Sequence, residues 1–200
     1  MERGELFSQD NPFSVLEEWM AAAAKTEIND PNAMALATVD NDGLPNVRIV
    51  LLKQLDDDGI VFFTNYNSAK GRELDTNRKA AFVIHWKSLG RQVRGRGRVE
   101  RVTDEVSDAY YQTRALDSRL GAWASDQTQP LEDRATLMEK VEAARQRFGD
   151  SPPRPPHWGG FRLTPNEMEF WADGAFRLHD RFRWSRASAE KDWQIKRLYP

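Results

Sequence analysis

The residues best suited to chemistry lie in one stretch near the end of the chain, residues 176–184, with the sequence FRLHDRFRW. Side chains of a β-strand alternate between two faces, so a strand here would place Arg177, His179, Arg181 and Arg183 on one face. The opposite face would carry Phe176, Leu178, Asp180, Phe182 and Trp184. A row of guanidinium groups and an imidazole suits a phosphorylated or otherwise anionic ligand, because arginine offers a planar fork of donors and keeps its charge. A solvated basic face on an edge strand is the competing interpretation.

A second group of polar residues precedes this stretch. Tyr110 and Arg114 lie four residues apart in a predicted helix and therefore on one helical face, and Ser118 follows a predicted break. Together these three side chains could hold a phosphate. An ordinary polar helix surface has the same spacing, and spacing alone favours it.

Other motifs point less clearly to chemistry. Arg48 and Lys53 differ in parity, so a regular strand sends them to opposite faces, and they can share a ligand only if the strand bulges or the ligand wraps its end. The basic run of residues 91–101 contains five arginines, but no stacking aromatic residues alternate with them, which disfavours nucleic-acid binding. Its interleaved Gly95 and Gly97 indicate a close approach to the backbone. The three aspartates of residues 56–58 are interpreted as turn formers. The chain has no dinucleotide fingerprint, P-loop or nucleophile elbow.

Composition limits the classes of protein that fit. The 200 residues are 40% hydrophobic, which is enough for one domain with a sizeable core. The 29 basic and 31 acidic residues give a formal net charge of -2, so no overall field attracts nucleic acid or an anionic membrane. There is no cysteine, which excludes disulfides and thiolate chemistry. The N-terminus lacks an apolar signal core, and no apolar run approaches the roughly 20 residues that cross a bilayer. We therefore expect a cytoplasmic protein without a membrane partner.

The remaining pattern predicts the elements that must position these residues. Asn11 and Pro12 begin a helix that runs to Ala24, and Ser68 begins a short helix that runs to Leu74. Further helices are expected at residues 103–114, 120–125 and 131–148, before a stiff proline-rich connector at residues 151–156. Strands are expected at residues 33–39, 46–53, 60–64, 80–86, 92–102, 161–163, 167–171, 176–184 and 193–198. Successive strands joined by short turns are typical of an antiparallel sheet that closes into a small barrel.

Several long motifs then resemble one family. They are RIVLLK (48–53), FFTNYNSAKGREL (62–74), HWKSLGRQVRGRGRVERV (85–102), SRLGAWASDQTQP (118–130), PPHWGGFRL (155–163), EFWADG (169–174), RLHDRFRW (177–184) and the final RLYP. In this order they resemble the pyridoxine (pyridoxamine) 5'-phosphate oxidase family. The resemblance implies a mainly β fold with peripheral α-helices, the FMN-binding split β-barrel. It also implies a homodimer with FMN in clefts at the subunit interface, and oxidation of pyridoxine or pyridoxamine 5'-phosphate to pyridoxal 5'-phosphate with O2 reduced to H2O2.

The resemblance also implies a domain layout and a role for each matching residue. Residues 1–200 would form one domain, with an N-terminal helical segment (1–30), a helical insertion (103–150) and C-terminal strands that complete the site (158–200). The residues expected to contact FMN are Arg48, Ile49, Val50, Leu51, Leu52, Lys53, Phe63, Thr64, Lys70, Gln92, Gln127, Thr128, Trp171 and Arg181. The residues expected to contact the phosphorylated substrate are Lys53, Tyr110, Arg114, Ser118, Arg177, Leu178 and His179. Arg177 and His179 would serve catalysis by orienting the substrate ring.

The chain departs from the family pattern at a few positions. Ala69 stands where the family usually has an arginine near the FMN phosphate, and Thr128 stands where serine is common. Two other functions remain open, a related split-barrel flavin reductase and a non-catalytic binder of FMN or pyridoxal phosphate. The retained Tyr110, Arg114 and Ser118, together with Arg177 and His179, argue against both.

Overall fold

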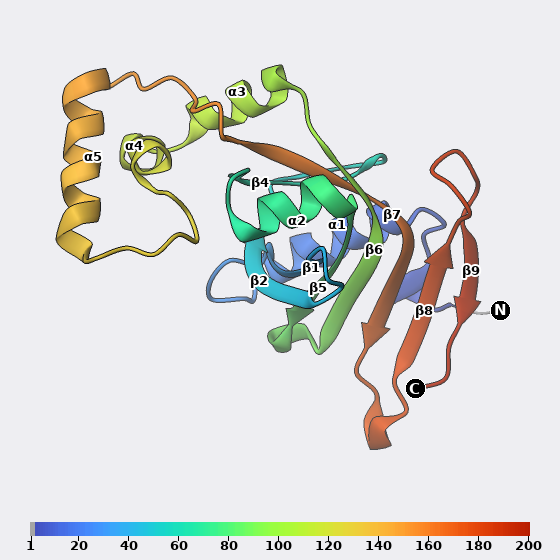
Figure 1. Ribbon diagram of the computed structural model, residues 1–200. Coiled ribbons are helices and arrows are strands. Elements are labelled where there is room, and N and C mark those ends of the chain that lie inside the picture. Colours follow the sequence, from blue (N-terminus) through green and yellow to red (C-terminus); the bar gives the residue numbers. More distant parts are fainter. Residues whose placement is uncertain (1–2) are drawn as a thin grey trace.

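The computed structural model describes residues 3–200, and antiparallel strands joined in one sheet make up most of the fold (Figure 1). The strand order is β2-β1-β5-β6-β7-β4-β3, with β8 paired to β7 and β9 paired to β8. The strands are β1 (Ala33–Val39), β2 (Pro45–Leu51), β3 (Gln54–Asp56), β4 (Gly59–Asn65), β5 (Lys79–Trp86), β6 (Arg91–Arg101), β7 (Trp158–Ala172), β8 (Asp180–Ser185) and β9 (Gln194–Arg197).

Strand β7 organises this sheet. Its first part pairs with β4 from Trp158 to Leu163, its last part pairs with β8 from Glu167 to Ala172, and β6 follows it through both parts. The two strands expected at residues 161–163 and 167–171 are therefore one strand. The register shifts between Arg96 and Gly97, where a Cβ on Gly97 would lie 2.1 Å from the carbonyl oxygen of Thr164. The close backbone approach expected at the glycines of β6 is thus confirmed, and the irregularity lets one long strand serve two parts of the curled sheet.

Helix α1 (Pro12–Ala23) covers the core. The side chain of Asn11 accepts a hydrogen bond from the backbone N–H of Phe13, which satisfies one of the free donors at the start of the helix. Its apolar residues Phe13, Leu16 and Trp19 are buried, and Trp19 meets Phe170 of β7 edge-on with ring centroids 5.3 Å apart. The predicted helix is confirmed, and its apolar stripe belongs to the main core.

Helix α2 (Ala69–Asn77) begins where the sequence predicts. Ser68 is its N-cap, and the Ser68 hydroxyl accepts a hydrogen bond from the backbone N–H of Gly71. The helix directly follows β4, so its first turn lies at the end of that strand. This position brings Lys70 beside Thr64.

Three further helices, α3 (Asp104–Thr113), α4 (Leu116–Ala124) and α5 (Arg134–Phe148), form a separate layer at one side of the sheet. Figure 1 shows α4 and α5 together on the side away from β8 and β9. Arg154 joins this layer to β7: its Nε donates to Asp108 at 2.5 Å, its Nη2 to Asp104 at 2.6 Å, and its Nη1 to the carbonyl oxygen of Trp158 at 2.7 Å.

The strand predicted for residues 176–184 is wrong in its first half. Residues 175–177 form a short 3-10 turn in which Phe176 (φ 58°) and Arg177 (φ 64°) have left-handed backbone angles, and β8 begins only at Asp180. Phe176 and Leu178 are 94% and 69% exposed, whereas Phe182 and Trp184 are buried. The alternation that would have aligned Arg177 with Arg181 fails because a strand period does not extend through this turn.

Within residues 3–200 no helix combines the length and the apolar character needed to span a membrane.

Candidate functional site

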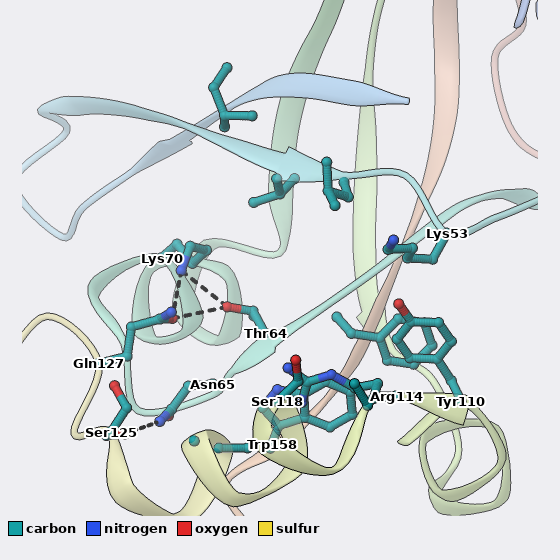
Figure 2. Close-up of a pocket in the computed structure, with 17 residues that line it drawn as sticks. Lys53, Thr64, Asn65, Lys70, Tyr110, Arg114, Ser118, Ser125, Gln127 and Trp158 are labelled. Atoms are coloured by element: carbon teal, nitrogen blue, oxygen red, sulfur yellow. Dashed lines mark hydrogen bonds between the residues drawn. The ribbon is translucent and has the colours of Figure 1, made fainter. Parts of the chain in front are cut away.

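A cavity of about 650 Å³ lies between β2, β4, the start of α2 and the helices α3 and α4 (Figure 2). Eleven of the residues predicted for the site line it: Ile49, Val50, Leu51, Lys53, Phe63, Thr64, Lys70, Tyr110, Arg114, Ser118 and Gln127. The cavity therefore joins residues from the two expected sets, one for cofactor and one for substrate.

One end of the cavity is built around Lys70, which is only 7% exposed. Its Nζ donates to Gln127 Oε1 at 2.8 Å and to Thr64 Oγ1 at 3.0 Å, and it lies 3.4 Å from Ser68 Oγ. All of these acceptors are neutral. Burial lowers the pKa of Lys70 to about 8, since desolvation disfavours the charged form and Arg48 adds repulsion. A buried ammonium that donates to neutral acceptors at the edge of a cavity is suited to bind an anion.

The other end of the cavity is built around Arg114, which follows the last residue of α3. Its Nη1 is buried and has no hydrogen-bond partner within the described chain. Burial lowers the pKa of this guanidinium from its ordinary value, although an arginine remains charged at neutral pH. Tyr110 and Ser118 line the same end. An unpaired buried donor of this kind is costly unless a ligand satisfies it.

Aromatic rings form the wall between these elements. Phe63 and Tyr110 are stacked with centroids 3.9 Å apart, and Trp158 lies nearly parallel to both at 5.6 Å and 6.2 Å. The guanidinium carbon of Arg114 lies 4.7 Å from the centre of the Trp158 ring. The wall is therefore flat and apolar, with a cation at its edge.

Arg48 does not line the cavity. It donates to Thr38 Oγ1 at 2.5 Å and to Glu73 at 3.2 Å, on the other side of β2 from Ile49. Lys53 does line the cavity, but it lies beyond Leu51, the last residue of β2, so strand alternation does not extend to it. Leu52 is buried in the core, and Thr128 accepts a hydrogen bond from the backbone N–H of Ala69 at the start of α2.

The remaining predicted residues form a second group on β6, β7, β8 and the turn that precedes β8. Gln92 pairs with Trp171, and Trp171 pairs with Arg181 across the neighbouring strand. The ring of His179 lies 4.6 Å from that of Trp171. None of these four residues lines the cavity of its own chain, and neither do Arg177 and Leu178.

Two carboxylates hold this second group in place. Glu169 is buried, and it accepts two hydrogen bonds from Arg181 through one oxygen and two from Arg94 through the other. Asp173 Oδ1 lies 3.0 Å from His179 Nδ1, a contact that is an ion pair only when the imidazole is protonated. Arg181 and His179 thus have carboxylate partners within their own chain.

Sequence reasoning missed several lining residues: Asn65, Ala115, Gly121, Ala122, Ser125 and Trp158. Trp158 lies inside the motif PPHWGGFRL, which was assigned no role. Its ring faces the cavity because β7 pairs with β4 at Asn65, a contact that no local pattern encodes.

Comparisons with known proteins identify the family of the chain. Residues 20–148 match the family model described as pyridoxamine 5'-phosphate oxidase, and residues 158–200 match the model described as pyridoxine 5'-phosphate oxidase C-terminal dimerisation region. The chain is 57% identical over its whole length to the pyridoxine/pyridoxamine 5'-phosphate oxidase of Roseobacter denitrificans, of which the match covers 99%. It is 58% identical to the protein of the same name from Cereibacter sphaeroides, with full coverage of both chains.

Solved structures show a similar fold. PhzG from Burkholderia lata 383, in complex with tetrahydrophenazine-1-carboxylic acid, has a TM-score of 0.92 and 32% identity, with 100% of this chain and 98% of PhzG covered. A pyridoxamine 5'-phosphate oxidase-related, FMN binding protein from Nostoc punctiforme has a TM-score of 0.75 at 16% identity, with 94% and 98% covered. The second likeness supports the fold alone, and that fold is the mainly β architecture expected from the sequence.

Proposed function

Because the chain belongs to the pyridoxamine 5'-phosphate oxidase family, we propose that it is an FMN-dependent oxidase that forms pyridoxal 5'-phosphate from pyridoxine 5'-phosphate or pyridoxamine 5'-phosphate. With the alcohol substrate, two electrons and two protons pass to O2 and give H2O2. With the amine substrate, water also enters and ammonia leaves. When bound, FMN supplies the hydride chemistry, and the protein supplies binding and orientation.

The observation that carries this proposal is a single cavity with a candidate anion-binding cation at each end. At one end Lys70 donates to neutral acceptors, and at the other end Arg114 has a buried nitrogen without a hydrogen-bond partner among the described residues. A phosphorylated cofactor and a phosphorylated substrate together supply two anions. The flat aromatic wall of Phe63, Tyr110 and Trp158 suits planar ring systems. The residues present therefore fit FMN.

The roles of the lining residues follow from their places. Lys70, Thr64 and Gln127 would hold the FMN phosphate, with Thr128 beside the start of α2. Main-chain and side-chain atoms of residues 49–53 would border the flavin ring. Tyr110, Arg114 and Ser118 would hold the substrate phosphate, and Figure 2 shows Lys53 on the same side of the cavity as Tyr110. Arg48 would act on the phosphate end indirectly, by occupying the Glu73 carboxylate.

The second group of residues would complete the site from another copy of the chain. Gln92, Trp171, Arg181, Arg177 and His179 lie outside the cavity of their own chain, and all but Gln92 belong to residues 158–200, which match a dimerisation region. Strand β2 is an edge strand, and its Val47 and Ile49 are more than 60% exposed. Such an apolar edge is suited to an interface. In the dimer, Arg177 and His179 would orient the substrate ring against the flavin, which accelerates reaction through proximity.

The test is to purify the protein, record its flavin absorbance and assay O2-dependent formation of pyridoxal 5'-phosphate. We expect a yellow protein that consumes O2 with either substrate and forms one H2O2 per product. Bound flavin without turnover would support a non-catalytic binder. Turnover that needs an added electron donor and another acceptor would support a flavin reductase.

A further inference from the structure

The guanidinium of Arg114 is held without a carboxylate. Among the described residues its side chain forms no hydrogen bond, and Nη1 is fully buried. Its guanidinium carbon lies over aromatic rings, 4.7 Å from the centre of the Trp158 ring and 6.0 Å from that of Tyr111. A desolvated cation over an indole is among the more strongly stabilised cation–π arrangements.

This arrangement differs from that of Arg181, another arginine assigned to the site. Arg181 gives Nε and Nη2 to the buried carboxylate of Glu169, so a fixed negative charge already occupies these donors. Stacking on a ring restrains the plane of a guanidinium but uses none of its N–H groups. Arg114 therefore keeps its donors and its charge available for an incoming anion.

Trp158 is itself held firmly. Trp158 is 6% exposed, and its carbonyl oxygen accepts a hydrogen bond from Arg154. The same arginine also donates to α3 and so connects that helix to β7. Tyr111 packs edge-on against its ring with centroids 5.3 Å apart. The indole and the helix that precedes Arg114 thus form one rigid unit.

We propose that Trp158 is a positioning and specificity residue, whose indole fixes the Arg114 guanidinium for the phosphate of the substrate and so favours phosphorylated over unphosphorylated pyridines. This inference rests on the proposed function, in which Arg114 meets that phosphate. It adds a residue that acts through Arg114 without contacting the phosphate itself.

The first test replaces the indole in the holoprotein. Trp158→Leu should raise KM for pyridoxine 5'-phosphate about tenfold, because a desolvated cation–π contact of this size is lost, while kcat changes little. Trp158→Phe keeps an aromatic face and should stay within about threefold of the parent protein. Trp158→Leu should lower kcat/KM for unphosphorylated pyridoxine less than kcat/KM for the phosphorylated substrate, since the unphosphorylated substrate offers Arg114 no phosphate.

Phe161→Leu is the matched control. Phe161 also lies on β7, is buried, and stacks on Phe62 with centroids 5.9 Å apart, but it does not line this cavity. It should lower the unfolding temperature without changing the ratio of KM values for the two substrates. A loss of preference in this control equal to that in Trp158→Leu would assign the effect to general packing and overturn the proposal.

A double-mutant cycle measures whether the effect of Trp158 on KM depends on Arg114, which a purely structural role would not require. If Trp158 acts through Arg114, Trp158→Leu should have no further effect on KM once Arg114→Ala is present. Full additivity of the two substitutions would contradict the proposal.

Equilibrium binding separates this inference from the proposed reaction. The dissociation constants of pyridoxal 5'-phosphate and of pyridoxal are measured by calorimetry on the holoprotein and on Trp158→Leu. Suppose that the parent protein shows no turnover but binds pyridoxal 5'-phosphate more tightly than pyridoxal, and that the ratio of these two dissociation constants is about tenfold smaller in Trp158→Leu. The oxidase proposal then fails, and the role of Trp158 stands. If the variant keeps the full preference, the role of Trp158 is refuted whether or not the protein is an oxidase.

Discussion

Lys70→Met should stabilise the flavin-free protein and weaken its binding of FMN. Lys70 places a charged group in a nearly buried position with only neutral acceptors, so the folded apoprotein carries the cost of its desolvation. Methionine keeps an unbranched chain of similar length without the charge. The substitution therefore tests separately what Lys70 does to the stability of the apoprotein and what it does to FMN binding.

The size of the stability gain follows from the pKa of Lys70, which burial lowers from 10.5 to about 8. At roughly 1.4 kcal/mol for each pKa unit the full difference would be about 3.5 kcal/mol. Because Lys70 borders an open cavity, solvent screening reduces this to about 1–2 kcal/mol.

The pH dependence has a definite sign. Between about pH 8 and pH 10.5 the unfolded chain binds more protons than the folded chain, so the free energy of unfolding of the parent apoprotein rises with pH across that window. Below pH 8 the cost is present in full. The advantage of Lys70→Met should therefore be largest below pH 8 and disappear above about pH 10.5.

Lys70→Met should weaken FMN binding, although it stabilises the apoprotein. Loss of a charge-assisted contact to phosphate costs about 1.5–3 kcal/mol, which is roughly ten- to a hundredfold in Kd. In the parent protein the affinity should fall as pH rises above about 8, because a neutral Lys70 must take up a proton to pair with the anion.

The assay is urea unfolding of the apoprotein at several pH values, with FMN titrations under the same conditions. Lys79→Met is the control, since Lys79 is exposed at the start of β5. An Lys70→Met apoprotein less stable than the parent at pH 7, together with an FMN affinity that does not change with pH, would refute the reasoning about this lysine.

Four further predictions concern other parts of the molecule. Ala69→Arg should tighten FMN binding by roughly ten- to a hundredfold through one added charge-assisted contact; an unchanged Kd in a flavin titration would show that position 69 does not face the phosphate. Arg177→Ala should leave a folded flavoprotein yet lower kcat/KM by an amount equivalent to about 1.5–3 kcal/mol, and steady-state kinetics equal to those of the parent protein would contradict its assigned role. Glu169→Ala should lower the free energy of unfolding by about 1.5–3 kcal/mol because Arg181 and the half-exposed Arg94 lose hydrogen bonds to their shared carboxylate; urea unfolding measures this, and an unchanged free energy of unfolding would contradict the role of Glu169 in holding Arg181. The active species should sediment as a dimer, so a monomer with full activity would exclude completion of the cavity by a second chain.

Local patterns in the sequence determined most of the elements. Asn11 with Pro12, and Ser68 before α2, mark helix starts because their side chains or ring geometry satisfy the first turn of a helix, and both helices begin there. The short strands with intervening turns predicted an antiparallel sheet, which the structure confirms. Long motifs also identified the family, and with it the candidate residues that line the cavity.

Only the tertiary structure decided how those residues are grouped. Residues 176–184 have a strand-like alternation, but Phe176 and Arg177 take left-handed backbone angles in a 3-10 turn, so the shared face does not exist. The sequence could not separate the cavity residues from the group on β6, β7 and β8, because strand pairing between distant segments sets that division. The same holds for Trp158, which reaches Arg114 only because β7 pairs with β4 and Arg154 fastens α3 beside it. Spacing along the chain determines which face of an element a residue occupies, while contacts distant in sequence determine what that face meets.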